Sequence, residues 1–313
     1  MFAPSDMRFI KGAIFTMGSD QFYPDERPAR RVRVDNFWID ETPVTNAQFA
    51  RFVKETGYVT LAETPPDPLT YTGLPPEIRH AGSLVFDKTE GPVSLSDPSQ
   101  WWSFCFGADW RRPLGPDSSL HGLEDHPVCH IAAADAEAYA DWAGKALPTE
   151  AEWECAARGG LDGAAYAWGD ELAPGGAMLA NYWQGIFPFH NQMLDGWERT
   201  SPVRAFPPNG FGVFDMIGNV WEWTADWYVQ STSLAKTCCV PQNPRGGVEL
   251  DRCDPPQHFP VPRRVLKGGS HLCAANYCRR YRPAARHPQP VDAPSGHIGF
   301  RCVMRRGPAG CDG

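Results

Sequence analysis

The segment Lys267-Gly-Gly-Ser-His-Leu-Cys-Ala-Ala-Asn-Tyr-Cys-Arg-Arg-Tyr-Arg-Pro-Ala-Ala-Arg286 holds two of the ten cysteines, Cys273 and Cys278, five positions apart. Five residues of α-helix turn through about 500°, so a helix would place the two thiols on different faces. A β-strand would place them on opposite faces, because their offset is odd. The sulfurs can therefore meet only if the short segment 274–276 turns back on itself.

Two converging cysteines have three uses: unrelated buried thiols, a disulfide, or a pair of thiolate ligands for a soft metal ion. The four arginines that follow would lower the pKa of nearby thiols and favour the thiolate; they are Arg279, Arg280, Arg282 and Arg286. Two sulfurs make only half of a structural zinc site, and no Cys-x2-Cys pair completes one. Thiolates in low coordination suit Cu(I). The spacing leaves a disulfide and a copper site open.

The same segment carries a resemblance. Its pattern Lys-Gly-Gly-Ser-x-x-Cys-x4-Cys-x-Arg-Tyr-Arg-x-Ala-Ala-Arg, together with Gly299-Phe-Arg-Cys302, resembles the C-terminal signature of formylglycine-generating enzymes. Trp142-Ala-Gly-Lys-x-Leu-Pro-Thr-Glu-Ala-Glu-Trp-Glu154 resembles the same family, and the likeness covers roughly residues 12–303. It implies an α+β fold: one mixed domain over 1–313 with a core at 12–303, little regular structure and a C-type-lectin-like architecture.

The resemblance also implies an activity. Enzymes of this family oxidise a cysteine within Cys-x-Pro-x-Arg of an unfolded sulfatase to Cα-formylglycine, with O2 as oxidant and Cu(I) as cofactor. Cys273 and Cys278 would hold the copper, and the hydroxyls of Ser270 and Tyr277 would orient substrate or oxygen. Two alternatives stay open: a metal-free thiol–disulfide oxidoreductase, and a non-catalytic sulfatase-binding member, although such members typically lack the cysteine pair.

The middle of the chain is rich in carboxylates, amides and turns. Calcium takes about six to eight oxygen ligands from such loops, but Asx turns use the same residues, and the residues alone favour turns. The resemblance implies two structural calcium ions. The first would be held by Asn181, Tyr182, Asp195 and Trp197, with Tyr182 and Trp197 acting through main-chain carbonyls. The second would be held by Asp215, Gly218, Val220 and Glu222, with Gly218 and Val220 acting through the main chain.

Composition excludes several classes of protein. The chain has 313 residues and a net charge of −8, from 29 basic and 37 acidic residues, so it has no electrostatic footprint for nucleic acid. No apolar run approaches the ~20 residues of a membrane span, and no signal peptide is evident. Ten cysteines are too sparse for a disulfide scaffold. We expect a bacterial cytoplasmic protein that is monomeric.

Four residues depart from the family pattern, and two of them bear on the expected compartment. Ala140 and Pro283 stand where secreted animal members carry extra disulfide cysteines. His297 replaces an asparagine common in the family, which puts one substrate contact in doubt, and Pro43 stands where some members have glutamate. Neither change removes the two sulfurs.

Local patterns predict the regular elements. Capping boxes predict helices at 45–56 and 149–158, and a third helix is expected at 132–143. Strands are expected at 9–17, 32–39 and 297–303, with a short one at 126–131. Residues 64–124 should be a loop-rich excursion with a short helix, fixed by Trp101, Trp102 and Trp110. In the loop 230–262, Cys238, Cys239 and Cys253 are interpreted as incidental thiols.

Overall fold

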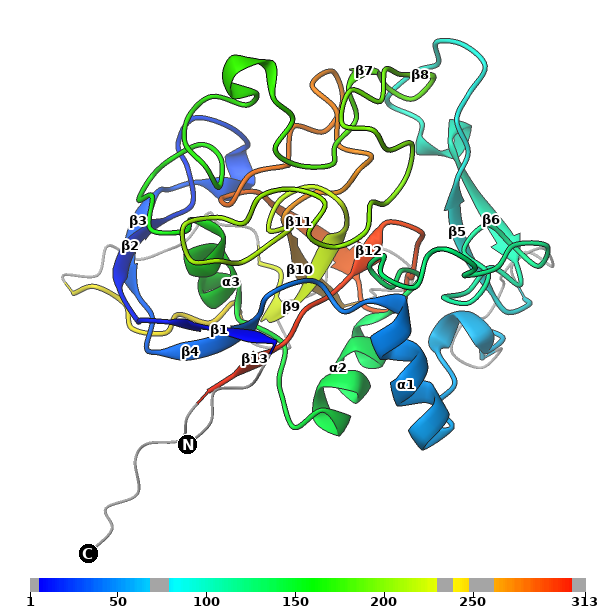
Figure 1. Cartoon of the computed structure of the whole chain (residues 1–313), viewed down its shortest axis with the longest axis horizontal. Helices are drawn as coiled ribbons and strands as arrows, with labels where there is room; N and C mark the ends of the chain where they lie inside the picture. Colours follow the sequence, from blue (N-terminus) through cyan, green and yellow to red (C-terminus); the bar gives the residue numbers. More distant parts are fainter. Residues whose placement is uncertain (1–5, 68–78, 230–238, 248–261, 306–313) are drawn as a thin grey trace, which may run out of the picture.

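The computed structural model describes residues 6–67, 79–229, 239–247 and 262–305 (Figure 1). Cys238, Cys253 and most of the predicted loop 230–262 lie outside the described residues, whereas Cys239 is described and exposed.

The described chain contains short strands and three short α-helices. The strands are β1 Met7–Ile10, β2 Ile14–Met17, β3 Arg30–Arg33, β4 Phe37–Asp40, β5 Gly82–Phe86, β6 Trp102–Phe106, β7 Gly185–Ile186, β8 His190–Asn191, β9 Trp221–Trp227, β10 Arg263–Lys267, β11 Arg286–Pro290, β12 Ile298–Gly299 and β13 Val303–Met304. The helices are α1 Asn46–Thr56, α2 Ala133–Trp142 and α3 Glu150–Ala157, with 3-10 turns η1 Pro24–Glu26, η2 Leu61–Glu63, η4 Pro98–Gln100 and η5 Pro174–Gly176. The predicted mixed α+β fold with little regular structure is confirmed.

Two small sheets organise these elements. The first has the order β11-β10-β9-β12, with antiparallel pairs except for the parallel pair of β12 and β9. The second has the order β1-β4-β13 and is antiparallel, so a strand near each end of the chain flanks β4 (Figure 1). The remaining strands form the hairpins β2-β3, β5-β6 and β7-β8.

All three predicted helices are confirmed, and their ends follow the predicted signals. The Thr45 hydroxyl accepts from the Gln48 N–H while the Gln48 side chain accepts from the Thr45 N–H, and Gly57 ends α1 with φ 71°. Thr149 and Glu152 form the same reciprocal cap on α3. Phe49 and Phe52 of α1 pack on Tyr139 of α2, and this contact holds the two helices together at one side of the core.

Two predicted strands, 9–17 and 32–39, are each broken in the middle. Gly12 lies at the first break: its N–H donates to Asn36 Oδ1 (2.8 Å), and a Cβ there would lie 2.4 Å from the Val34 carbonyl oxygen. The two breaks face each other, so the pair bends and continues as β1-β4 on one side and β2-β3 on the other. The sequence patterns that predict the two strands carry no sign of this bend.

The predicted strand 297–303 is also divided. Residues 298–299 join β9, residues 303–304 join β4, and Phe300 and Arg301 between them are fully buried. The short strand expected at 126–131 was wrong: this segment makes only an isolated bridge, from Pro127 to Thr45. Its backbone groups instead make single hydrogen bonds to several other segments, such as the bond from the Val128 N–H to the Val44 carbonyl oxygen (2.9 Å).

The excursion 64–124 contains a hairpin that was not predicted. Strands β5 and β6 pair across the connection 87–101, which contains the 3-10 turn η4 where a short helix was expected. The tryptophans do anchor the excursion: Trp101 and Trp110 are buried, and Trp101 packs in a cluster with Phe86, Trp183 and Phe187. This cluster lies directly beside the cysteine segment, because it also contains Leu272 and Ala274.

Candidate active site

The two sulfurs predicted to converge do so. Cys273 Sγ lies 3.1 Å from Cys278 Sγ. This separation exceeds the ~2.05 Å of a disulfide bond and corresponds to two sulfurs sharing a hydrogen bond. Cys273 is buried (2% exposed), whereas Cys278 is half-buried, so the pair leads from the core toward the surface.

The chain turns back between the cysteines as the spacing required. The N–H groups of Tyr277 and Cys278 both donate to the Ala274 carbonyl oxygen, at 3.2 and 3.0 Å. The Cys273 N–H donates to the carbonyl oxygen of Ser270 (2.9 Å). Gly269, with φ 74°, lets the returning chain approach, since a Cβ there would lie 2.8 Å from the Arg280 carbonyl oxygen. The predicted bend is therefore confirmed.

The pKa values of the two thiols are shifted in opposite directions. Burial raises the pKa of Cys273, but the hydrogen bond from Cys278, the N–H of Ser270 and the charge of Arg280 outweigh it, so the pKa falls. The hydrogen bond to Cys273 and burial raise the pKa of Cys278 well above its ordinary value. The first proton of the pair thus leaves readily and the second is retained.

Ser270 and Tyr277 both lie beside the sulfurs. Ser270 is fully buried; its N–H points at Cys273 Sγ (3.5 Å), and its hydroxyl oxygen accepts from the Leu272 N–H (3.3 Å). Tyr277 is 37% exposed and stacks on Phe187, with ring centroids 4.6 Å apart. Burial raises the pKa of Tyr277, as do the charges of the two cysteines, which are its neighbours. The structure thus places both side chains around the thiols, and their catalytic roles stay predictions.

The four arginines do not act alike. Arg280 lies close enough to lower the pKa of Cys273. Arg282 and Arg286, in contrast, pair with buried carboxylates: Arg282 Nη1 bonds to Glu26 (2.7 Å) and Arg286 Nη2 bonds to Glu150 (3.0 Å). Their charge stabilises the fold rather than the thiolates.

Residues at 23–26 complete the site and were missed by sequence reasoning. The Tyr23 hydroxyl accepts from the Arg279 N–H (3.0 Å), Asp25 pairs with Arg280 (2.9 Å), and Glu26 holds Arg282. The turn η1 therefore clamps the segment that follows Cys278. No local pattern could reveal this, because about 255 residues separate the partners.

His297, the departure from the family pattern, lies at the aromatic side of the site. Its ring is 4.7 Å from that of Trp102, and its Nδ1 is 2.8 Å from Ser295 Oγ. Burial lowers the pKa of His297 well below its usual range, so the ring is neutral. His130 is fully buried, and its Nδ1 lies 2.8 Å from Ser83 Oγ.

The residues predicted for the first calcium ion lie together. Gln184 Nε2 is 2.7 Å from an Asp195 carboxylate oxygen and also contacts the Tyr182 carbonyl oxygen, so both oxygens point at one place. Asn181 donates its side-chain amide to the Arg199 carbonyl oxygen (2.8 Å). The Trp197 N–H donates to Asp195 (2.9 Å). Two predicted oxygens thus fit a cation that displaces the glutamine amide.

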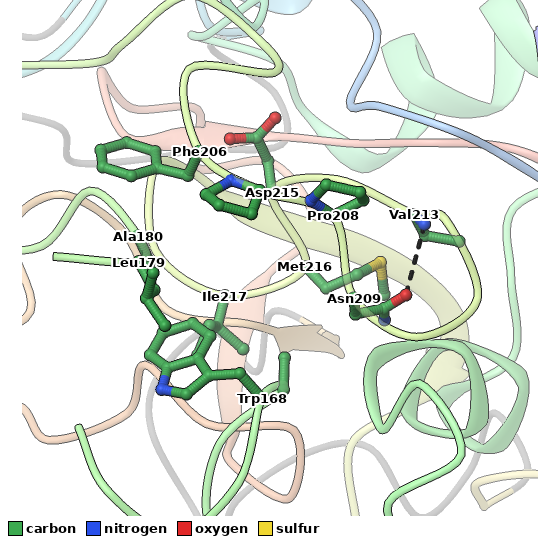
Figure 2. A pocket seen from close by; sticks show the side chains of 12 residues that line it. Trp168, Leu179, Ala180, Phe206, Pro208, Asn209, Val213, Asp215, Met216 and Ile217 are labelled. Carbon is green, nitrogen blue, oxygen red and sulfur yellow. Dashed lines mark hydrogen bonds between the residues drawn. The ribbon is translucent and has the colours of Figure 1, made fainter. Parts of the chain in front are cut away.

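The second predicted calcium site contains two carboxylates, but an arginine already binds one of them. Burial, together with the charge of nearby Glu222, raises the pKa of Asp215 to about 6. Glu222, however, binds Arg301 through both oxygens (2.7 and 2.8 Å). Figure 2 shows Asp215 with the apolar side chains that line the same small cavity, among them Phe206 and Met216. Gly218 and Val220 lie between the two acids in sequence. Asp215 Oδ2 accepts from the Arg204 N–H (2.9 Å), so a cation would share this carboxylate with the main chain, whereas at Glu222 it would compete with Arg301.

The described residues contain no group of three His, Cys, Asp or Glu side chains arranged to hold a metal ion. This is compatible with the predicted ligand sets, which use two thiols or rely on carbonyl oxygens. Among the described helices, none has the length and apolarity that crossing a membrane demands.

Comparison with known proteins decides the family. Residues 2–306 match the family model described as "Sulfatase-modifying factor enzyme 1-like domain". The formylglycine-generating enzyme of Mycobacterium tuberculosis is 51% identical over 297 residues, which cover 94% of this chain and 96% of that protein. The chain belongs to the formylglycine-generating enzyme family. The enzyme of that name from Streptomyces coelicolor is 45% identical over 304 residues, covering 94% of this chain and 87% of that one.

A solved structure supports the fold described for this member of the formylglycine-generating enzyme family. PvdO from Pseudomonas aeruginosa superposes with a TM-score of 0.62 at 23% identity, covering 96% of this chain and 94% of that one. The family model and the named relatives confirm the resemblance seen in the cysteine segment, and they confirm the expected enzyme class.

Proposed function

We propose that the chain oxidises the cysteine of a Cys-x-Pro-x-Arg motif in an unfolded sulfatase to Cα-formylglycine, using O2 and Cu(I). The contact of Cys273 Sγ with Cys278 Sγ at 3.1 Å carries this proposal, since it supplies two soft ligands at one point. Cys273 is buried and Cys278 is half-buried, so a substrate side chain would reach the pair at Cys278.

The net reaction converts the substrate side chain from a thiol on a methylene carbon to an aldehyde. Water supplies the aldehyde oxygen, hydrogen sulfide leaves, and two electrons and two protons pass to O2. Cu(I) bound by the two thiolates would supply the electron exchange with O2. Cys273 loses its proton readily because of its neighbours, which prepares the ligand pair. Ser270, fixed beside Cys273, would orient the substrate sulfur. Tyr277 would present its hydroxyl at the open side.

The decisive experiment uses a Cys-x-Pro-x-Arg peptide with copper-loaded protein and O2. Conversion of thiol to aldehyde lowers the peptide mass by about 18 units. Cys273→Ser and Cys278→Ser should abolish both copper binding and conversion, whereas Cys105→Ser, a half-buried cysteine of β6, should keep both. Full activity in Cys273→Ser would overturn the proposal.

A metal-free thiol–disulfide oxidoreductase is the second candidate, because sulfurs 3.1 Å apart need little movement to form a disulfide. Such an enzyme would show a reversible two-electron couple without O2 and would leave the peptide mass free of the aldehyde change. A non-catalytic sulfatase-binding role is disfavoured by the presence of both cysteines. Binding of the peptide without any conversion, in copper-loaded protein, would establish it.

The two calcium ions are also proposed, as structural cofactors. The convergence of the Tyr182 and Asp195 oxygens supports the first ion, and the half-buried Asp215 supports the second. Calcium should raise the unfolding temperature and chelator should lower it. Asp195→Asn and Asp215→Asn should each reduce that response, and an unchanged response in both variants would contradict the proposal.

We further propose a monomeric protein of the bacterial cytoplasm. Ala140, buried in α2, and Pro283 stand where secreted family members carry disulfide cysteines, which supports a reducing compartment. Light scattering of the purified chain and fractionation of the source cells test the two statements.

A further inference from the structure

The hairpin β7-β8 exposes apolar side chains where the fold does not need them. Ile186 is 53% exposed, and Met193 and Leu194, which follow β8, are 46% and 64% exposed. We define these three residues as the hairpin patch. The three side chains lie within nine residues of the chain, and exposed apolar patches on a folded protein are candidate surfaces for binding a partner.

The hairpin is fixed to the cysteine segment. The carbonyl oxygen of Phe187, next to Ile186, accepts from the Asn276 side-chain amide (3.1 Å), and the Phe187 N–H donates to Asn276 Oδ1 (3.2 Å). Just before the hairpin, the Trp183 N–H donates to the Cys273 carbonyl oxygen (3.0 Å). Figure 1 shows β7 and β8 beside the segment that carries the two cysteines. The hairpin patch therefore keeps a constant position relative to the sulfurs.

The exposed side of the thiol pair faces the hairpin. Tyr277, the neighbour of Cys278, is 37% exposed and stacks face to face on Phe187, with an angle of 5° between the rings. Because Cys278 is the more exposed of the two thiols and directly follows Tyr277, a polypeptide whose cysteine reaches Cys278 would lie close to this aromatic pair. An extended chain advances about 3.3 Å per residue, so residues a few positions from the modified cysteine come to the hairpin patch.

Resting on the proposed function, we propose that the hairpin patch binds the client polypeptide outside its Cys-x-Pro-x-Arg motif and selects apolar flanking residues. The partner is an extended segment of an unfolded chain, because only unfolded chains offer consecutive apolar side chains beside a reachable cysteine. The hairpin patch adds affinity that depends on the flank, while the sulfurs act on the motif.

The test measures binding, so it does not depend on turnover. Fluorescent peptides carry the motif with serine for cysteine: the motif alone, the motif with an apolar flank on either side, and the motif with aspartates in that flank. Fluorescence anisotropy should give the apolar-flanked peptide a Kd about tenfold lower than the aspartate-flanked one, as burial of one or two apolar side chains allows.

A charge introduced in the hairpin patch should reverse the preference. Ile186→Lys should bind the aspartate-flanked peptide more tightly than the apolar one, and Leu194→Lys should do the same. Leu161→Lys is the matched control: it is 43% exposed, and its neighbour Asp162 bonds to Thr16 of β2, on another side of the molecule (Figure 1). It should keep the wild-type preference.

Equal Kd values for the three peptides in the wild type, or an unchanged preference in both lysine variants, would overturn the inference. Absence of the aldehyde mass change with a cysteine peptide would instead count against the proposed oxidation, which the binding data do not address.

Discussion

Replacement of Glu26 by alanine should destabilise the protein strongly. Glu26 and Arg282 are 2% and 1% exposed, and their side chains bond through two contacts, one of 2.7 Å. The guanidinium also lies 3.6 Å from the centre of the Phe22 ring. Glu26→Ala leaves the guanidinium buried without its carboxylate, which typically costs about 3–5 kcal/mol. Because a domain is stable by about 5–15 kcal/mol, this is a large part of the total.

Urea unfolding followed by tryptophan fluorescence measures this loss. The matched control is Glu55→Ala, which breaks the pair with Arg51 on the surface of α1; those side chains are 45% and 72% exposed. An exposed pair contributes under about 1 kcal/mol. Adding Arg282→Met to Glu26→Ala should recover much of the stability, since no buried charge is then left unpaired. Equal losses for Glu26→Ala and Glu55→Ala would refute the reasoning.

Three further predictions follow from the site and the helices. Cys278→Ala should raise the pKa of Cys273, because the thiol then loses the hydrogen bond from Cys278 that lowers it, and the pH dependence of iodoacetamide labelling at Cys273 would show the shift; a fall would contradict the sulfur contact. Thr149→Ala removes the cap of α3 and should cost about 1 kcal/mol in urea unfolding, against little change for Ser96→Ala, whose exposed hydroxyl contacts that of Ser94. Burial lowers the pKa of His130 to about 4. As the pH falls, the ring therefore takes up a proton in the unfolded chain before it does so in the folded chain, and the free energy of unfolding should decrease between about pH 6.5 and 4. His130→Gln should flatten that decline, and an unaltered slope would argue against a neutral buried ring.

The features that could be predicted from the sequence are those determined by residues close together along the chain. The caps of α1 and α3 lie within four residues, and the bend between Cys273 and Cys278 follows from their spacing once the two sulfurs are required to meet. The family signature then supplied the fold class, because it recurs along most of the chain.

The rest depends on partners distant in sequence. The clamp of Glu26 on Arg282 joins positions 256 apart, and no local pattern indicates it. The division of 297–303 between two sheets arises because Arg301 must turn inward to Glu222, which a strand-like apolar run conceals. The hairpin β5-β6 was missed because its long connection, 87–101, is not the tight turn whose residues announce a hairpin.

The sharing of β4 between β1 and β13 has a consequence for biosynthesis. Ile39 pairs with Arg8 on one edge and with Val303 on the other. During translation the first partner is available almost at once, whereas the second emerges from the ribosome only near the end of synthesis, and Arg282 reaches Glu26 scarcely earlier. Closing such long loops is entropically costly and slow. The nascent chain must therefore wait, with the loop that carries Cys273 and Cys278 unassembled, until synthesis is nearly complete.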